Sequence, residues 1–131
     1  MPHTQLLPEG WPKPKGYSNG VSASGSKIIF LGGQIGWDLN GNFPSKEFLG
    51  QLEQTLENVK AVLNAARLCP EDMTRMTWYL TDKASYVNNL RQVGKIYREI
   101  MGRNFPAMSV VQVSALIEDE ALIEIEVTAV K

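Results

Sequence analysis

The sequence predicts an α+β domain in which two helices cover one face of a mixed β-sheet. Its 131 residues suffice to bury one hydrophobic core but not two, so residues 1–131 are expected to form a single domain. Two long segments carry apolar residues at spacings of three and four, and the segments around them are β-prone. In chain order these segments read β-β-α-β-α-β-β, which is typical of a layer of helices packed on a sheet.

The N-terminal residues 1–15 are expected to form an extended lead-in. Three prolines and two glycines occur in "PEGWPKPKG", residues 8–16, and they disfavour regular structure. The β-prone region that follows, "YSNGVSASGSKIIFLGGQIGWDLNGNF", contains a compact apolar run at residues 28–31. Asn40 and Gly41 predict a hairpin there, because both residues tolerate the positive φ of a type I′ turn.

The first helix is expected to begin near Ser45 and to end at Pro70, which cannot continue it. Ser45 suits the N-cap, and Glu47 in the first turn favours the helix dipole. The apolar stripe is Leu49, Leu52, Leu56, Val59, Leu63 and Ala66.

A strand and a second helix follow. The segment "MTRMTWYLT", residues 73–81, alternates Met76, Trp78 and Leu80 with Arg75, Thr77 and Tyr79, as a strand does. The helix is expected from about Lys83, with Asp82 or Thr81 as its cap and Gly102 just past its end. Its apolar stripe is Tyr86, Leu90, Val93, Tyr97 and Ile100.

Two strands close the chain, at 108–116 and 121–130, joined by the acidic turn "IEDE". The first of them carries apolar residues on both faces, Val110 on one and Val111 and Val113 on the other. Because the helices cover only one face, the other needs a second cover, and another subunit would supply it. This pattern predicts a homo-oligomer.

Composition and charge exclude several classes of function. Thirteen basic and 14 acidic residues nearly cancel, and no basic run offers the electrostatic footprint that nucleic-acid binding needs. Cys69 is the single cysteine, so no internal disulfide is possible and a reducing, cytoplasmic location is expected. The N-terminus lacks the apolar stretch of a signal peptide, and no apolar run is long enough to span a membrane.

The single histidine, His3, lies in a terminus that is expected to be mobile or lightly held. A catalytic triad with serine or cysteine and a zinc site are therefore both disfavoured. Without metal or organic cofactor, any chemistry must use carboxylates, hydroxyls, arginines, backbone groups and water.

Two short motifs stand out as candidate sites. "GGQIG", residues 32–36, does not lead into a helix, so it is better explained by close backbone approach within a strand or bulge than by phosphate binding. In "LIEIEVTAV", Glu124, Glu126 and Thr128 share one face of the last strand. That face is by default solvated; at a subunit interface, a desolvated glutamate would have a raised pKa and could orient or deprotonate a water.

Taken alone, Met108 is ordinary core filler, and Trp37, Trp78 and Tyr79 are ordinary packing residues. A family resemblance changes this interpretation. The stretches "GYSNGV", "IFLGGQIGWDLNG", "QLEQTLENVKAVLNAA", "YLTDKASYVNNL", "NFPAMSVVQVSAL" and "IEIEVTAV" resemble, in order, the signature motifs of the RidA family, also called YjgF/YER057c or endoribonuclease L-PSP. They span nearly the whole chain, from Gly16 to Val130.

The resemblance implies a chorismate-mutase-like α+β fold assembled as a homotrimer, with sites in clefts between subunits. It also implies hydrolysis of enamines and imines, such as 2-aminoacrylate, to a keto acid and ammonia without metal or cofactor. By the same resemblance Tyr17 and Gly33 shape the pocket, and Glu124 positions the attacking water. The position of the family's carboxylate-binding arginine is occupied here by Met108.

A thioether cannot replace a guanidinium, because it has no charge and donates no hydrogen bond. Losing such a pair costs on the order of 2–5 kcal/mol, or tens- to thousands-fold weaker handling of small imino acids. The first hypothesis is then a divergent hydrolase whose larger, more apolar or differently charged substrate meets Met108, Trp37 and Tyr79. Arg103 is a candidate for the missing charge, but it is more simply explained as a loop or helix-end arginine. The alternatives are a non-catalytic trimeric module that binds a metabolite and, third, a ribonuclease or translation inhibitor.

Overall fold

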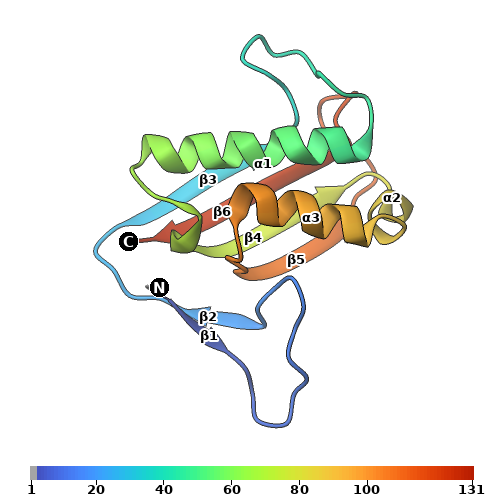
Figure 1. The fold of residues 1–131 in the computed structure, drawn as a ribbon. Helices are drawn as coiled ribbons and strands as arrows, with labels where there is room; N and C mark the ends of the chain where they lie inside the picture. Colours follow the sequence, from blue (N-terminus) through green and yellow to red (C-terminus); the bar gives the residue numbers. More distant parts are fainter. Residues whose placement is uncertain (1–2) are drawn as a thin grey trace.

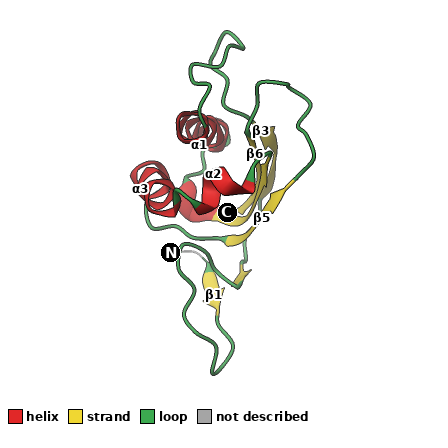
Figure 2. Cartoon of the chain, turned by 90° about the vertical axis from the view of Figure 1, so that its right-hand side faces the viewer, coloured by secondary structure: helices red, strands yellow, loops and turns green. Residues whose placement is uncertain are grey.

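The computed structural model describes residues 3–131 and shows one layer of helices on one face of a β-sheet (Figures 1 and 2). The strands are β1 (Thr4–Leu6), β2 (Gly20–Ser22), β3 (Ile28–Gln34), β4 (Met73–Leu80), β5 (Ala107–Gln112) and β6 (Ile123–Val130). The helices are α1 (Phe48–Ala65), α2 (Lys83–Val87) and α3 (Leu90–Met101), with a 3₁₀ turn at Pro70–Asp72. This arrangement confirms the predicted α+β architecture.

The main sheet has four strands in the order β3-β6-β4-β5 and is mixed, as expected. Strand β6 runs antiparallel to both β3 and β4, whereas β4 and β5 are parallel and are connected through α2 and α3. Strands β5 and β6 therefore do not pair with each other. The predicted turn "IEDE", residues 117–120, belongs to a longer connection, since β5 ends at Gln112 and β6 begins at Ile123.

The core lies between the helices and the covered face of the sheet. The helical stripe predicted in α1 is buried there, with Leu52, Leu56, Val59 and Leu63 fully inaccessible. Strand alternation is also confirmed: Met76, Trp78 and Leu80 of β4 are buried, as are Ile123, Ile125, Val127 and Ala129 of β6. Burial of these side chains supplies the main drive for folding.

The ends of the first helix differ from the prediction. Helix α1 begins at Phe48 with Glu47 as its N-cap, so Ser45 lies before the helix, where its hydroxyl accepts a hydrogen bond from the Glu47 N–H. The helix ends at Ala65, before Pro70 is reached, because Arg67 adopts a left-handed φ of 62° that reverses the chain. Pro70 instead starts the 3₁₀ turn.

The second predicted helix is two helices. Asp82 caps α2 as expected, since its carboxylate accepts a hydrogen bond from the Ala84 N–H. The helix stops at Val87 and restarts at Leu90, so the two asparagines, Asn88 and Asn89, separate α2 from α3. Asparagine is a weak helix former because its side chain competes for backbone hydrogen bonds. At the far end Gly102 has a φ of 69°, as expected for a glycine terminating a helix.

The hairpin predicted at Asn40–Gly41 was wrong. The next element after this turn is helix α1, and β3 pairs with β6, which is distant in sequence. Only Gly41 of the two residues has a positive φ, and the Asp38 carboxylate accepts hydrogen bonds from the N–H groups of Asn40 and Asn42. An aspartate-capped loop turn thus occupies the place of a type I′ hairpin.

The N-terminal segment is held more firmly than predicted. The His3 side chain is buried, and its Nε2 donates a hydrogen bond to the Asp72 carbonyl at 2.9 Å. Thr4–Leu6 pairs with Gly20–Ser22 as a small two-stranded sheet at the lower end of the molecule in Figure 1. Residues 8–16 form neither helix nor strand, as expected.

Candidate functional site

The open face of the sheet, which no helix covers, carries the polar residues of the two central strands (Figure 2). Glu124 of β6 lies opposite Tyr79 of β4, and Glu126 lies opposite Thr77. On the neighbouring strand β3, Phe30 is 77% exposed and Ile28 is 58% exposed. This face therefore combines carboxylates with uncovered apolar side chains.

Glu124 lies against the backbone of Gly33. A Cβ atom built on Gly33 would be only 1.9 Å from Glu124 Oε2, so a side chain at residue 33 would displace this carboxylate. The pairing of β3 with β6 is irregular between Leu31 and Gln34, as expected for a bulge at the glycines. A Cβ atom built on Gly36 would likewise lie only 2.9 Å from the Gln51 carbonyl oxygen. These contacts agree with the close-approach interpretation of "GGQIG".

The two glutamates of the open face have different surroundings. Glu126 accepts a hydrogen bond of 2.7 Å from the Tyr79 hydroxyl, and this bond is the main reason why the pKa of Tyr79 is raised. The Glu124 side chain is half-buried and has no hydrogen-bond partner within residues 3–131. Glu124 is therefore the glutamate of this pair whose carboxylate remains available to a water or ligand.

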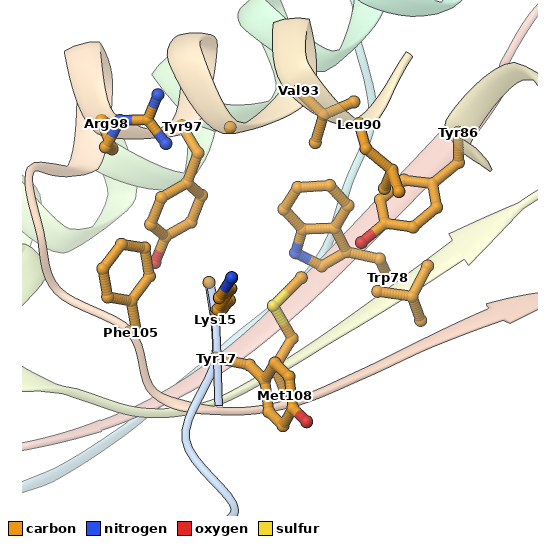
Figure 3. A pocket seen from close by; sticks show the side chains of 13 residues that line it. Lys15, Tyr17, Trp78, Tyr86, Leu90, Val93, Tyr97, Arg98, Phe105 and Met108 are labelled. Carbon is orange, nitrogen blue, oxygen red and sulfur yellow. The ribbon is translucent and has the colours of Figure 1, made fainter. Parts of the chain in front are cut away.

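On the covered side, a cavity of about 510 Å³ opens between α3 and the edge of the sheet (Figure 3). It is bounded by α3, by β4 and β5, and by the N-terminal segment around Tyr17. Its lining residues are mostly aromatic or aliphatic: Tyr17, Trp78, Tyr86, Leu90, Val93, Tyr97, Phe105, Met108 and Val110. Met108 lies beside Met76 in the parallel register of β4 and β5, which places both on the covered face.

Tyr17 reaches this cavity because the chain beside it is tied to the start of β5. The Ser18 N–H donates to the Pro106 carbonyl at 3.0 Å, and the Ser18 hydroxyl donates to the Phe105 carbonyl. Ser18 also forms a parallel bridge with Ala107. These contacts bring Tyr17 and Met108 together from positions far apart in sequence.

The structure thus divides the predicted site residues into two groups. Tyr17 and Met108 share the cavity on the covered side, whereas Gly33, Glu124 and Tyr79 share the open face. Within one chain the sheet separates these groups.

The other two predicted residues do not line the cavity of Met108. Trp37 lies in the loop after β3, 39% exposed, with its ring 6.4 Å from that of Phe43. Arg103 follows α3 and borders a second hollow next to the cavity.

The sequence analysis did not place the α3 wall of the cavity in the site. Leu90, Val93 and Tyr97 were assigned to the core stripe, and Arg98 was not considered. A signal was present in Gly94, which lies one helical turn after Leu90. A residue without a side chain on the core-facing side of a helix leaves room for a cavity.

Neither a metal centre nor a membrane segment is found in the described part of the chain. Within residues 3–131 no three His, Cys, Asp or Glu side chains are grouped so that they could hold a metal ion. None of the helices there has the length and apolar character needed to cross a membrane.

Comparison with known proteins links this geometry to a family. The profile described as Endoribonuclease L-PSP matches residues 12–131. A RutC family protein of Pyrococcus horikoshii is 37% identical over 128 residues, which cover 96% of each protein. TdcF of Escherichia coli, whose given name proposes a reactive intermediate deaminase, is 33% identical over 119 residues, covering 88% of this chain and 86% of that protein.

Solved structures agree in fold. YyfB of Yersinia pestis, a Rid-family protein described as of unknown function, has a TM-score of 0.88 and 31% identity, with 100% of both chains covered. Escherichia coli TdcF with bound serine has a TM-score of 0.68 and 30% identity, with 98% of both chains covered. The fold is thus the chorismate-mutase-like α+β fold, and the chain belongs to the RidA (YjgF/YER057c, endoribonuclease L-PSP) family.

Proposed function

We propose that this protein hydrolyses imines or enamines to a carbonyl compound and ammonia, at sites formed between subunits of a homotrimer. The observation that carries the proposal is the contact of the Glu124 carboxylate with Gly33, on a sheet face that no helix covers. A carboxylate that has no hydrogen-bond partner, and that lies on a rigid strand beside the backbone of a glycine, is suited to holding a water for attack.

The separation of the two groups of site residues supports a site between subunits. Tyr17 and Met108 lie on one side of the sheet and Glu124 on the other, so a single chain does not bring them to one ligand. A second copy packed on the open face would cover Phe30 and Ile28 and would place its own residues beside Glu124. Each site would then take its water-handling and its binding residues from different copies.

The reaction needs only water and proton transfer. An enamine first takes a proton from solvent at its β-carbon and so becomes the imine. The oxygen of one water then adds to the carbon of the C=N bond while Glu124 accepts a proton from that water. The resulting carbinolamine nitrogen is protonated, the C–N bond breaks, and ammonia leaves as the carbonyl forms. One water is consumed and one ammonia released without any change in oxidation state.

One relative, Escherichia coli TdcF, supports a deaminase in two ways. The name of Escherichia coli TdcF proposes a reactive intermediate deaminase, and its structure was solved with serine, a small amino acid. Met108 separates this chain from the family's pattern, because a thioether cannot pair with a substrate carboxylate. We therefore expect an altered substrate range, directed to larger or more apolar imines.

A non-catalytic, trimeric metabolite-binding module is the second candidate. It is favoured by the lining of the cavity, which contains no histidine or carboxylate. The third candidate, ribonuclease or translation inhibition, is disfavoured by the near balance of 13 basic and 14 acidic residues.

The test is imine hydrolysis across a panel. An amino-acid oxidase generates imines in place from small, aliphatic, aromatic and acidic amino acids, and semicarbazide traps what the protein does not remove. Faster loss of large imines supports the hydrolase, whereas no acceleration for any imine leaves the binding module. Sedimentation analysis of the same preparation should give a trimer, and a monomer would rule out a site shared between subunits.

A further inference from the structure

The cavity beside Met108 is apolar at one end and cationic at the other. Lys15 and Arg98 are the charged residues among its lining, and no acidic residue accompanies them. Figure 3 shows both cations toward the Phe105 end, whereas Tyr86 and Leu90 lie at the opposite end. A ligand that fills this cavity therefore has apolar surface around one end and positive charge near the other.

Neither cation is engaged by the protein. Within residues 3–131 the salt bridge of the chain is Lys46–Glu120, and the side chains of Lys15 and Arg98 make no hydrogen bond. Arg98 folds back over Gly94: a Cβ atom built on Gly94 would lie 2.9 Å from Arg98 Nη1. Gly94 therefore both widens the cavity and admits the guanidinium to its mouth.

A second hollow of about 660 Å³ continues the cationic end. It shares Lys15, Tyr17, Arg98 and Phe105 with the cavity and adds Lys13 and Arg103, again without an acidic residue. Arg103, which the sequence analysis named as a candidate for the missing charge, borders this hollow and not the cavity of Met108. Positive charge at the mouth comes mainly from residues that the sequence analysis did not assign to the site.

We infer that the cavity binds a carboxylate attached to an aromatic or large branched apolar group, with the carboxylate held by Arg98 and Lys15 in place of an arginine at residue 108. A cavity of about 510 Å³ accommodates a ring or a branched chain, and its apolar walls favour both. Guanidinium and ammonium groups supply charge-assisted hydrogen bonds to a carboxylate.

For the reaction this inference rests on the proposed function, and it makes the substrate an aromatic or large aliphatic 2-imino acid. Binding can be measured without turnover, using the keto acid that such a reaction would release. Phenylpyruvate carries both the ring and the carboxylate, pyruvate lacks the ring, and phenylacetone lacks the carboxylate. The three probes separate the two parts of the predicted ligand.

The experiment is calorimetric titration of the full chain with each probe. Phenylpyruvate should bind at least about tenfold more tightly than pyruvate, and Arg98→Gln or Lys15→Gln should weaken it by about tenfold or more. Phenylacetone should bind the variants and the natural chain equally, which also shows that the cavity is intact. Arg91→Gln is the matched control, because Arg91 is exposed on α3 and borders neither hollow.

Two results would overturn the inference. Unchanged phenylpyruvate binding in both Arg98→Gln and Lys15→Gln would remove these residues as the anchor. Tighter binding of phenyl phosphate than of phenylpyruvate, with the same dependence on Arg98, would assign the site to a phosphorylated ligand.

The inferred ligand class and the proposed function can be tested separately. Binding that depends on Arg98 without hydrolysis of any imine would leave the ligand class standing and remove the hydrolase. Hydrolysis of aromatic imines at full rate by Arg98→Gln would support the hydrolase and remove Arg98 as the carboxylate anchor.

Discussion

The open face of the sheet and the cavity on its covered side differ in both charge and surface. The open face presents carboxylates, with Glu124 against the backbone of Gly33 and Glu126 bonded to Tyr79. The cavity presents aromatic walls and two cations, and no carboxylate. A carboxylate repels an anionic ligand whereas a cation attracts it, and the sheet keeps these two kinds of group apart within the chain.

The period of the strands creates this separation. Successive side chains of a strand point to opposite faces, so Ile125 enters the core while Glu124 and Glu126 face away from it. The same rule, applied through the parallel register of β4 and β5, puts Met108 beside Met76 on the covered side. Under the proposed function, a second copy of the chain would bring the two groups of residues to one ligand.

The largest effect is expected from Glu124→Gln. The amide keeps the shape of the side chain but cannot accept a proton, so imine turnover should fall by about 100-fold or more while the trimer persists. Initial rates with semicarbazide trapping and sedimentation of the same sample measure both quantities. Glu126→Gln is the control and should keep most of its activity, because Tyr79 already occupies the Glu126 carboxylate. Full activity of Glu124→Gln would remove this residue from the mechanism.

Met108→Arg tests the covered side of the comparison. A guanidinium at residue 108 should raise turnover of 2-aminoacrylate by about tenfold or more, because it restores a partner for a small carboxylate. It should also slow turnover of aromatic imines, since it fills part of the cavity beside Trp78. Competition between the two imines in one assay gives the ratio of their turnover rates directly. No gain with 2-aminoacrylate would show that other pocket residues have changed as well.

Gly33→Ala and Gly36→Ala separate function from stability. The new methyl group at residue 33 meets the mobile end of Glu124, which can move, so turnover should fall about tenfold with little loss of stability. At residue 36 it meets the Gln51 backbone at 2.9 Å, so the free energy of unfolding should fall by about 1–3 kcal/mol. Urea denaturation and initial rates are the measurements. Equal effects in both variants would contradict the contact between Gly33 and Glu124.

The smallest effect concerns Tyr79. Its pKa is raised mainly by the hydrogen bond to Glu126, so Glu126→Gln should lower the pKa of Tyr79 toward the ordinary value of about 10. A raised pKa in the folded state contributes stability that is complete below the unfolded value and lost as pH rises through the folded value. Ultraviolet titration of tyrosinate, with Tyr79→Phe to identify the signal, measures the shift. An unchanged titration would show that the bond does not form in solution.

Much of the fold could be predicted from local pattern. The apolar stripe of α1, the alternation of β4 and β6 and the close approach of the glycines in "GGQIG" were all confirmed. Each depends on the spacing of side chains along one element, which is a property of the sequence itself. The motifs that pointed to the RidA family are also local, because each is a short stretch of sequence and they occur in the expected order along the chain.

The hairpin at Asn40–Gly41 was wrong because turn signals do not specify which strand pairs with which. The single second helix was wrong for a different reason, since Asn88 and Asn89 divide it into α2 and α3. Whether β3 finds its partner in the next segment or in β6 depends on the whole core. His3 was likewise placed by a long-range contact, with the Asp72 carbonyl 69 residues away.

The sequence by itself determined which residues are candidates for the site: a glutamate at 124, a glycine at 33 and a methionine where the family resemblance expects a guanidinium at 108. Only the tertiary structure decided that Glu124 and Met108 lie on opposite sides of the sheet, and that Arg98 and Lys15 meet at the mouth of one cavity. The physical reason is that chemical character belongs to single residues, whereas proximity depends on strand register and on packing between distant segments.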